Sequence, residues 1–153
     1  MLNADVPTEL EPIENLAAFP MAGGKLTGVA CFYYADANLT PARQMFEGVL
    51  LSLGDQASVF YSANRDDDTL SGYLVRSGQD VLLDQYSSQV KLRRMDASLE
   101  EPWRRLLGKE LEWMWSCRNS RGYVDCVLLS FESNVPSVGV VVLASELRVF
   151  VIV

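Results

Sequence analysis

The sequence contains no histidine among its 153 residues. A Ser-His-Asp triad, a Cys-His dyad and a His-ligated metal site all need an imidazole, so the chain cannot build any of them. Cysteine is also scarce, with only Cys31, Cys117 and Cys126. An odd, sparse set without framework spacing predicts free thiols in a reducing compartment. We therefore expect a cytoplasmic protein with no metal and no other cofactor.

The sequence also has few basic residues and no long uninterrupted apolar run. The most apolar stretch, residues 138–153, is interrupted by Glu146 and Arg148 and is shorter than the about 20 residues that a membrane span needs. The 13 basic residues are outnumbered by 20 acidic ones, which leaves a net charge of −7. Nucleic-acid binding depends on clustered Lys and Arg. We expect neither a membrane nor a nucleic-acid partner.

The composition that remains is typical of one globular domain, with 49% apolar and 10% aromatic residues. Residues 1–24 carry acidic side chains and no Lys or Arg, so they lack the basic start of a secretory signal. We divide the chain into this acidic N-terminal arm and a single domain over 25–153. Within the arm, Thr8-Glu9-Leu10-Glu11 resembles a capping box and predicts a short helix. The alternative is an acidic, partly disordered arm.

Alternation of apolar and polar residues predicts a fold that is α+β and mostly antiparallel β, with about seven or eight strands. The expected strands cover residues 27–34, 46–53, 58–63, 70–75, 111–117, 123–130, 138–143 and 147–153. Thr40-Pro41 offers an alternative helix start before the second of these strands. The last two strands are so apolar that we expect burial on both faces.

One amphipathic helix is expected over Leu99–Leu107. Ser98 is placed to cap it, Glu101 completes a capping box, and Gly108 is placed to end it. Leu99, Trp103, Leu106 and Leu107 would form its apolar stripe. Residues 80–90 are ambiguous.

Residues 111–117 and 123–130 predict a hairpin with two distinct faces. If Arg118 pairs with Tyr123, then Trp115 faces Cys126 and Trp113 faces Leu128. The two indoles then share a face with room to pack against Trp103, or they anchor a partner, because Trp is enriched at binding hot spots.

The opposite face of that hairpin would carry Glu112 and Asp125. Paired carboxylates serve as acid and base when their environments separate their pKa values. The expected register leaves these two further apart than neighbours, so we expect an exposed strand face. Both residues remain candidates for contact with a partner.

Three adjacent carboxylates, Asp66, Asp67 and Asp68, stand in a predicted turn. Like charges this close repel each other unless solvent or a cation screens them. We consider three interpretations: a solvated turn, contact with a basic protein partner, and a metal site. Alternation of side chains makes a shared metal difficult, so a basic protein partner is the functional reading that we keep.

Several strings in the sequence resemble small bacterial single-domain proteins, some of which are immunity partners of secreted toxins. They are Phe46-Glu47-Gly48-Val49, Leu53-Gly54-Asp55, Asp67-Asp68-Thr69-Leu70, Trp113-Met114-Trp115, Gly122-Tyr123-Val124-Asp125 and Leu129-Ser130-Phe131. The resemblance implies an acidic, non-enzymatic inhibitor that binds and occludes a toxin.

The first functional hypothesis is therefore a protein-binding module, with the candidate contact residues Asp66, Asp67, Asp68, Glu112, Trp113, Trp115 and Asp125. One alternative is a structural subunit of a phage or secretion assembly. Such a subunit would bind neighbouring subunits, including copies of itself, through the C-terminal strand. The other alternative is a carboxylate- or metal-dependent enzyme.

Overall fold

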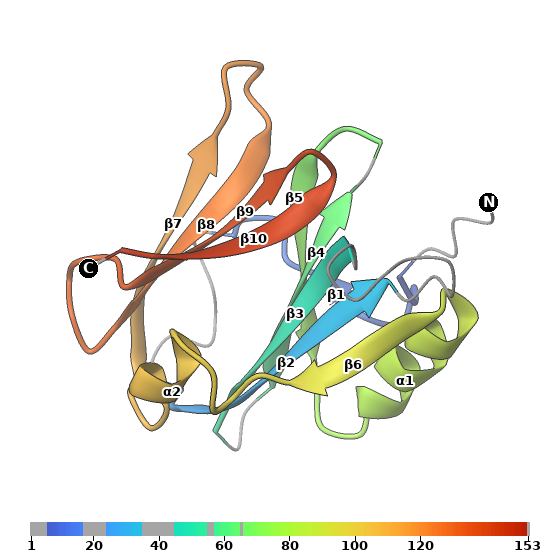
Figure 1. The fold of residues 1–153 in the computed structure, drawn as a ribbon, viewed down its shortest axis with the longest axis horizontal. Coiled ribbons are helices and arrows are strands. Elements are labelled where there is room, and N and C mark those ends of the chain that lie inside the picture. The colour runs from blue at the N-terminus through green and yellow to red at the C-terminus, as the bar shows by residue number, and fades with distance from the viewer. Residues whose placement is uncertain (1–5, 17–23, 35–44, 55–56, 65, 153) are drawn as a thin grey trace.

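The computed structural model describes residues 6–16, 24–34, 45–54, 57–64 and 66–152. These residues form three layers, with a six-stranded sheet between helix α1 (Asp80–Gln89) and a four-stranded sheet (Figure 1). The predicted α+β class with mostly antiparallel strands is confirmed. The predicted number of strands is too low, because the described residues form ten strands in two sheets.

The six-stranded sheet is antiparallel throughout, in the order β1-β5-β4-β3-β2-β6. Its strands are β1 (Glu11–Pro12), β2 (Leu26–Tyr34), β3 (Met45–Leu53), β4 (Ser58–Asn64), β5 (Thr69–Val75) and β6 (Leu92–Asp96). Strands β2 to β5 confirm the four strands expected in this region, whereas β1 and β6 were not expected. The alternative helix start at Thr40-Pro41 lies outside the described residues, and the chain from Met45 onward is a strand.

The four-stranded sheet has the order β10-β9-β8-β7. Its strands are β7 (Leu111–Arg118), β8 (Val124–Phe131), β9 (Val138–Leu143) and β10 (Glu146–Val151). The expected burial of the last two strands on both faces holds for only one face of β9, where Val138, Val140 and Val142 are buried, since Leu143 on the other face is 54% exposed. It is wrong for β10, because this strand lies at the edge of the sheet and Val151 is 50% exposed.

The predicted register of the β7–β8 hairpin is wrong by two residues. Trp115 pairs with Leu128 and Trp113 pairs with Ser130, because Arg118 pairs with Val124 and the ladder then shifts between Arg118 and Cys117. A shift of two residues keeps every side chain on its predicted face, since side chains alternate with a period of two. The two indoles therefore share a face, as expected.

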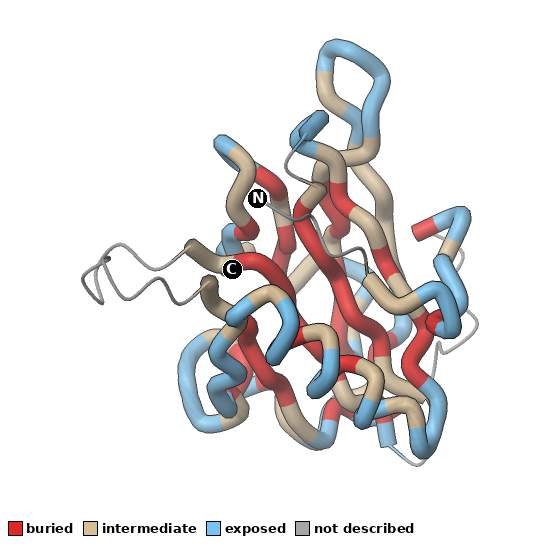
Figure 2. Tube along the Cα trace, turned by 90° about the vertical axis from the view of Figure 1, so that its right-hand side faces the viewer, coloured by how far each residue is buried: buried red, intermediate tan, exposed pale blue. Residues whose placement is uncertain are grey.

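The main core fills the space between the two sheets, and Figure 2 shows buried residues along the middle of the strands. Val127 and Leu129 of β8 belong to this core, together with Val49 and Leu51 of β3. A second cluster lies on the other face of the six-stranded sheet, where Leu83 of α1 is fully buried. The six-stranded sheet is thus covered on both faces.

The helix expected over Leu99–Leu107 is wrong in length, because only α2 (Trp103–Leu106) is helical. Proline disfavours a helical conformation in the residue before it, so Pro102 prevents a helix that begins at Leu99. The Ser98 hydroxyl accepts a hydrogen bond from the Val29 backbone N–H at 2.9 Å and does not cap a helix. Leu99 is 75% exposed, whereas Trp103 is buried in the main core.

The regular helix of the described residues is α1, in the segment that the sequence left ambiguous. It has only two buried residues, Leu83 and Ser87, which explains the weak apolar stripe in its sequence. Neither α1 nor α2 has the length and apolar character that a membrane-spanning helix requires.

The short helix expected in the N-terminal arm is also wrong, because Glu11–Pro12 forms β1 and pairs with β5. Ile13 continues this contact by donating its backbone N–H to the Gly72 carbonyl at 2.8 Å. Leu10 and Leu16 are buried at 1% and 6% exposure. The described part of the arm, residues 6–16, therefore packs on the domain, while residues 17–23 next to the expected boundary lie outside the described residues.

Candidate functional site: the outer face of the four-stranded sheet

One face of the four-stranded sheet is not covered by any helix or strand of the described residues (Figure 1). Its inner face packs on the six-stranded sheet through alternate side chains, such as Val140 of β9 and Leu147 of β10. The intervening side chains must point the other way. We call this second surface the outer face. Its apolar and cysteine side chains include Trp113, Trp115, Cys117, Cys126, Leu128, Val141 and Phe150, which follow from the strand register.

An apolar row crosses the outer face from one edge of the sheet to the other. Trp115 pairs with Leu128, Leu128 pairs with Gly139, and Gly139 pairs with Phe150. A Cβ atom built on Gly139 would lie only 2.2 Å from the ring of Phe150. The absence of a side chain at Gly139 therefore leaves the space that the Phe150 ring occupies. Phe150 is nevertheless 39% exposed.

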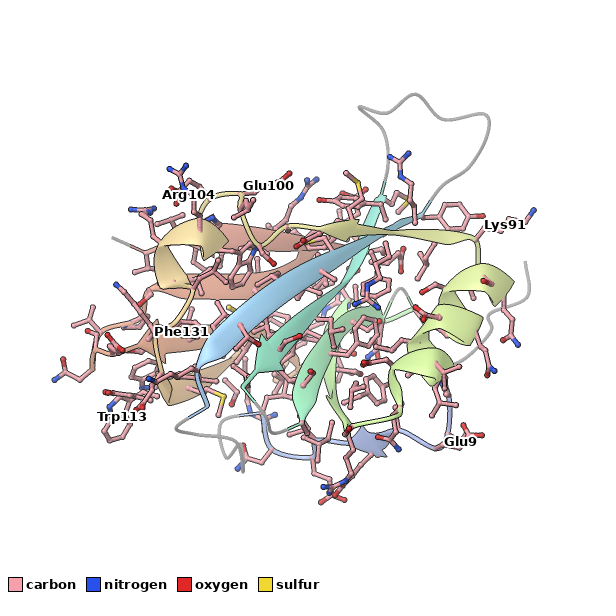
Figure 3. The ribbon with its side chains drawn as sticks, turned by 90° about the horizontal axis from the view of Figure 1, so that it is seen from below. Glu9, Lys91, Glu100, Arg104, Trp113 and Phe131 are labelled. Atoms are coloured by element: carbon pink, nitrogen blue, oxygen red, sulfur yellow. The ribbon has the colours of Figure 1, made fainter. Side chains whose placement is uncertain are left out.

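Trp113 follows on the same face, two residues before Trp115 on β7. Its side chain is 55% exposed and projects away from the body of the protein (Figure 3). The opposite residue, Ser130, is fully buried and donates its hydroxyl to the Ser133 carbonyl. The residue opposite Trp113 thus has its own hydrogen bond, and more than half of the Trp113 surface faces solvent.

A second row places Cys117 opposite Cys126, Cys126 opposite Val141, and Val141 opposite Arg148. Burial, followed by the neighbouring Cys117, raises the pKa of the Cys126 thiol to about 12. Arg148 forms an ion pair with Glu146 at 2.8 Å. Both residues belong to β10, so these charges lie at the β10 edge of the outer face. The centre of the outer face is apolar and carries two thiols.

The candidate contact residues from the sequence fall into two groups. Trp113 and Trp115 lie on the outer face, and exposed Glu112 adjoins them at the start of β7. Asp125 is half-buried and lies at the other end of the hairpin, beside the ladder shift that precedes Arg118. Glu112 and Asp125 are therefore not brought together.

Asp66, Asp67 and Asp68 are exposed in the turn between β4 and β5. Asp67 accepts hydrogen bonds from the backbone N–H and the hydroxyl of Thr69, at 3.1 and 2.6 Å. Asp68 accepts one from the Ser145 hydroxyl at 3.0 Å, which links this turn to the turn between β9 and β10. Two of the three carboxylates thus have local partners, and they lie at the end of the molecule opposite Glu112.

The three tryptophans do not form one cluster. Trp103 is 3% exposed and belongs to the main core, whereas Trp113 is on the opposite side of the four-stranded sheet. The interpretation in which the expected helix packs on the hairpin through three indoles is wrong, because the hairpin presents both of its indoles on the outer face.

A cavity of about 440 Å³ lies between the N-terminal segment, β5 and the far end of the β7–β8 hairpin. Its lining includes Glu14, Tyr73 and Arg118, none of which the sequence singled out. These residues come from three distant parts of the chain, so no local motif indicates them. Arg118 donates a hydrogen bond to the Gly122 carbonyl at 2.7 Å, which fixes its guanidinium to the hairpin turn.

Metal binding has no obvious location in the part of the chain that the structure describes. No three acidic or cysteine side chains among those residues come close enough to hold an ion.

Together these features define a three-layer α+β domain whose smaller sheet leaves an apolar outer face. Residues 15–153 match the Family of unknown function (DUF6334), and the chain belongs to that family. The match covers both sheets apart from β1, and it includes the whole outer face. No curated protein and no solved structure matches the chain.

Proposed function

We propose that this protein is a non-enzymatic protein-binding module that uses the outer face of its four-stranded sheet to bind a partner. The observation that carries the proposal is the exposure of large apolar side chains on that face, namely 55% for Trp113 and 39% for Phe150. Aromatic side chains that remain exposed on one continuous surface are typical of binding hot spots.

The dimensions of the outer face suit such a role. Four strands at about 4.8 Å spacing, each six or more residues long, present a surface of roughly 20 by 20 Å. A sheet face of about 400 Å² is large enough to hold an apolar patch of the size that is often functional on monomeric proteins. Trp113 and Phe150 lie on the two outer strands of the sheet, and these strands are three strand spacings or about 14 Å apart. They could therefore contact two separate pockets of one partner.

Charge supports a partner with basic groups around an apolar centre. Exposed Glu112 adjoins Trp113, and the whole chain has a net charge of −7. A charge of this sign increases the association rate with a basic protein and disfavours acidic ones.

The test starts by capturing proteins on the immobilised full chain from the source cells and identifying those that are retained. Each is then purified, and its affinity is measured for wild type, Trp113→Ala, Phe150→Ala and the control Val81→Ala. Val81 is 53% exposed on α1, on the far side of the molecule. We expect at least a tenfold loss for each outer-face variant and none for the control. A partner that binds all four proteins equally would refute the proposed surface.

We propose further that the partner is a toxin or effector that this module occludes, as the resemblance to immunity proteins implies. The product of the adjacent gene is the first candidate. Expression of that product should arrest growth, and co-expression of wild type should restore it while Trp113→Ala should not. A neighbouring product that neither binds nor inhibits growth would refute this narrower proposal and leave the binding surface itself untouched.

A structural subunit is the second candidate function, and the position of β10 favours it. This strand pairs with β9 on one side and forms the edge of its sheet. An edge strand can add to the sheet of a neighbouring molecule. Light scattering over a dilution series tests the homo-oligomeric form, because a chain that remains monomeric at high concentration would exclude it.

A further inference from the structure

Two of the three cysteines lie directly opposite each other on the outer face. Cys117 of β7 and Cys126 of β8 are register partners in the β7–β8 hairpin. Opposite residues of an antiparallel pair have Cα atoms about 4.5–5.5 Å apart. A disulfide needs Cα atoms about 4.4–6.8 Å apart. The separation typical of opposite residues thus lies within the range that a disulfide requires.

We propose that Cys117 and Cys126 form a reversible dithiol–disulfide site, oxidised by a low-molecular-weight disulfide. This site does not depend on the proposed binding function, because it needs only the two thiols and the small oxidant.

The difference in exposure between the two thiols sets the order of the steps. Cys117 is half-buried, whereas Cys126 is 7% exposed. The Cys117 thiolate attacks the small disulfide, which breaks its S–S bond, forms a mixed disulfide and releases one small thiol. The Cys126 thiolate then attacks the Cys117 sulfur and releases the second small thiol. Two protein thiols are oxidised, one small disulfide is reduced to two thiols, and the two protons pass to those thiols.

The environment of Cys126 keeps the second step internal. Because burial raises the pKa of Cys126, its thiol stays protonated at neutral pH and reacts slowly with molecules in solution. The mixed disulfide on Cys117 is held beside it, so the low thiolate fraction is compensated by proximity.

The third cysteine provides a control within the same chain. Cys31 lies on β2 in the other sheet and is 5% exposed. Its register partners are Val49 and Met95, so no cysteine lies opposite it. We expect Cys31 to remain a free thiol under conditions that oxidise the other two.

The experiment incubates the full chain with oxidised glutathione at increasing ratios to reduced glutathione, followed by acid quenching, alkylation and mass spectrometry. We expect two of the three thiols to be lost, an intact mass lower by two hydrogen atoms, and a peptide that links Cys117 to Cys126. Reduced glutathione should restore all three thiols. Retention of three thiols, accumulation of glutathione adducts only, or disulfide-linked dimers would overturn the proposal.

Two variants test the order of attack. Cys126→Ser should accumulate one glutathione adduct on Cys117, because the resolving thiol is missing. Cys117→Ser should react at least tenfold more slowly, because the remaining thiol is buried. Cys31→Ser should form the disulfide as wild type does. Peptide mapping of wild type decides the proposal without these variants if one of them fails to fold.

Discussion

Replacement of Leu10 by alanine tests whether the N-terminal segment is part of the folded core. Leu10 is 1% exposed and belongs to the same apolar cluster as Phe60 of β4 and Leu83 of α1. Burial of a leucine side chain contributes about 1.5–3 kcal/mol, and the cavity left by its removal adds to the loss. We expect Leu10→Ala to lower the free energy of unfolding by about 3 kcal/mol. For a chain of this size that corresponds to a fall in Tm of about 6–12 °C.

The matched control is Leu99→Ala, since Leu99 is 75% exposed and its truncation should change stability by less than about 0.5 kcal/mol. Both variants are compared with wild type by urea unfolding, followed by circular dichroism and by tryptophan fluorescence. Coincident transitions and equal m-values would justify a two-state analysis. If Leu10→Ala is as stable as Leu99→Ala, residues 6–16 do not pack as described and our assignment of the segment to the core is wrong.

Three further predictions concern residues of the two sheets. Trp103→Ala should lower the free energy of unfolding by about 3–5 kcal/mol, because the Trp103 side chain is 3% exposed. Trp113 is 55% exposed, so Trp113→Ala should change the free energy of unfolding by less than about 0.5 kcal/mol. Urea unfolding measures both changes. Gly139→Ala should lower the free energy of unfolding by about 1–3 kcal/mol, because its Cβ would lie 2.2 Å from the Phe150 ring. Gly28→Ala is the control, since the atom nearest to its Cβ is 3.6 Å away. Equal losses of stability in the two variants would contradict this account. Burial raises the pKa of Cys31 from an ordinary 9.0 to about 12, so the stability linked to this thiol is complete below pH 9 and is lost as the pH rises toward 12. Cys31→Ala should flatten that alkaline decline in a pH series of unfolding curves, and an unchanged slope would contradict the assignment.

The strands could be predicted where alternation and turn residues coincide. The β3–β4 and β7–β8 hairpins follow from Gly54 and Gly122, which adopt positive φ angles of 67° and 84° in the structure. Strand β1 could not be predicted, because it is two residues long and exists only through its pairing with β5. The helix expected to begin at Leu99 is wrong because Pro102 disfavours the helical conformation of the residue before it, despite the capping residues at Ser98 and Glu101.

In the candidate site too, residues placed by their local sequence pattern could be predicted, and residues placed by contacts between distant strands could not. Trp113 and Trp115 could be identified from the sequence because they alternate on one strand. Phe150 could not, since its place on the same face requires β8 and β9 to pair so that Leu128 meets Gly139. Asp67 stays a candidate contact residue, and the structure adds that it is exposed and accepts two hydrogen bonds within its own turn. Such local bonds depend on turn geometry that residue identity alone does not define.

The pairing of β1 with β5 has a consequence for association between molecules. Without β1, the edge of the six-stranded sheet would be β5, a seven-residue strand with unpaired backbone groups along one side. Such edges recruit strands from other chains and lead to aggregation. Pro12 of β1 has no backbone N–H to offer a further strand, and Glu11 adds a charge at the same place. Strand β1 therefore ends the sheet beside Gly72, Tyr73 and Leu74 and limits the addition of further copies along that part of β5.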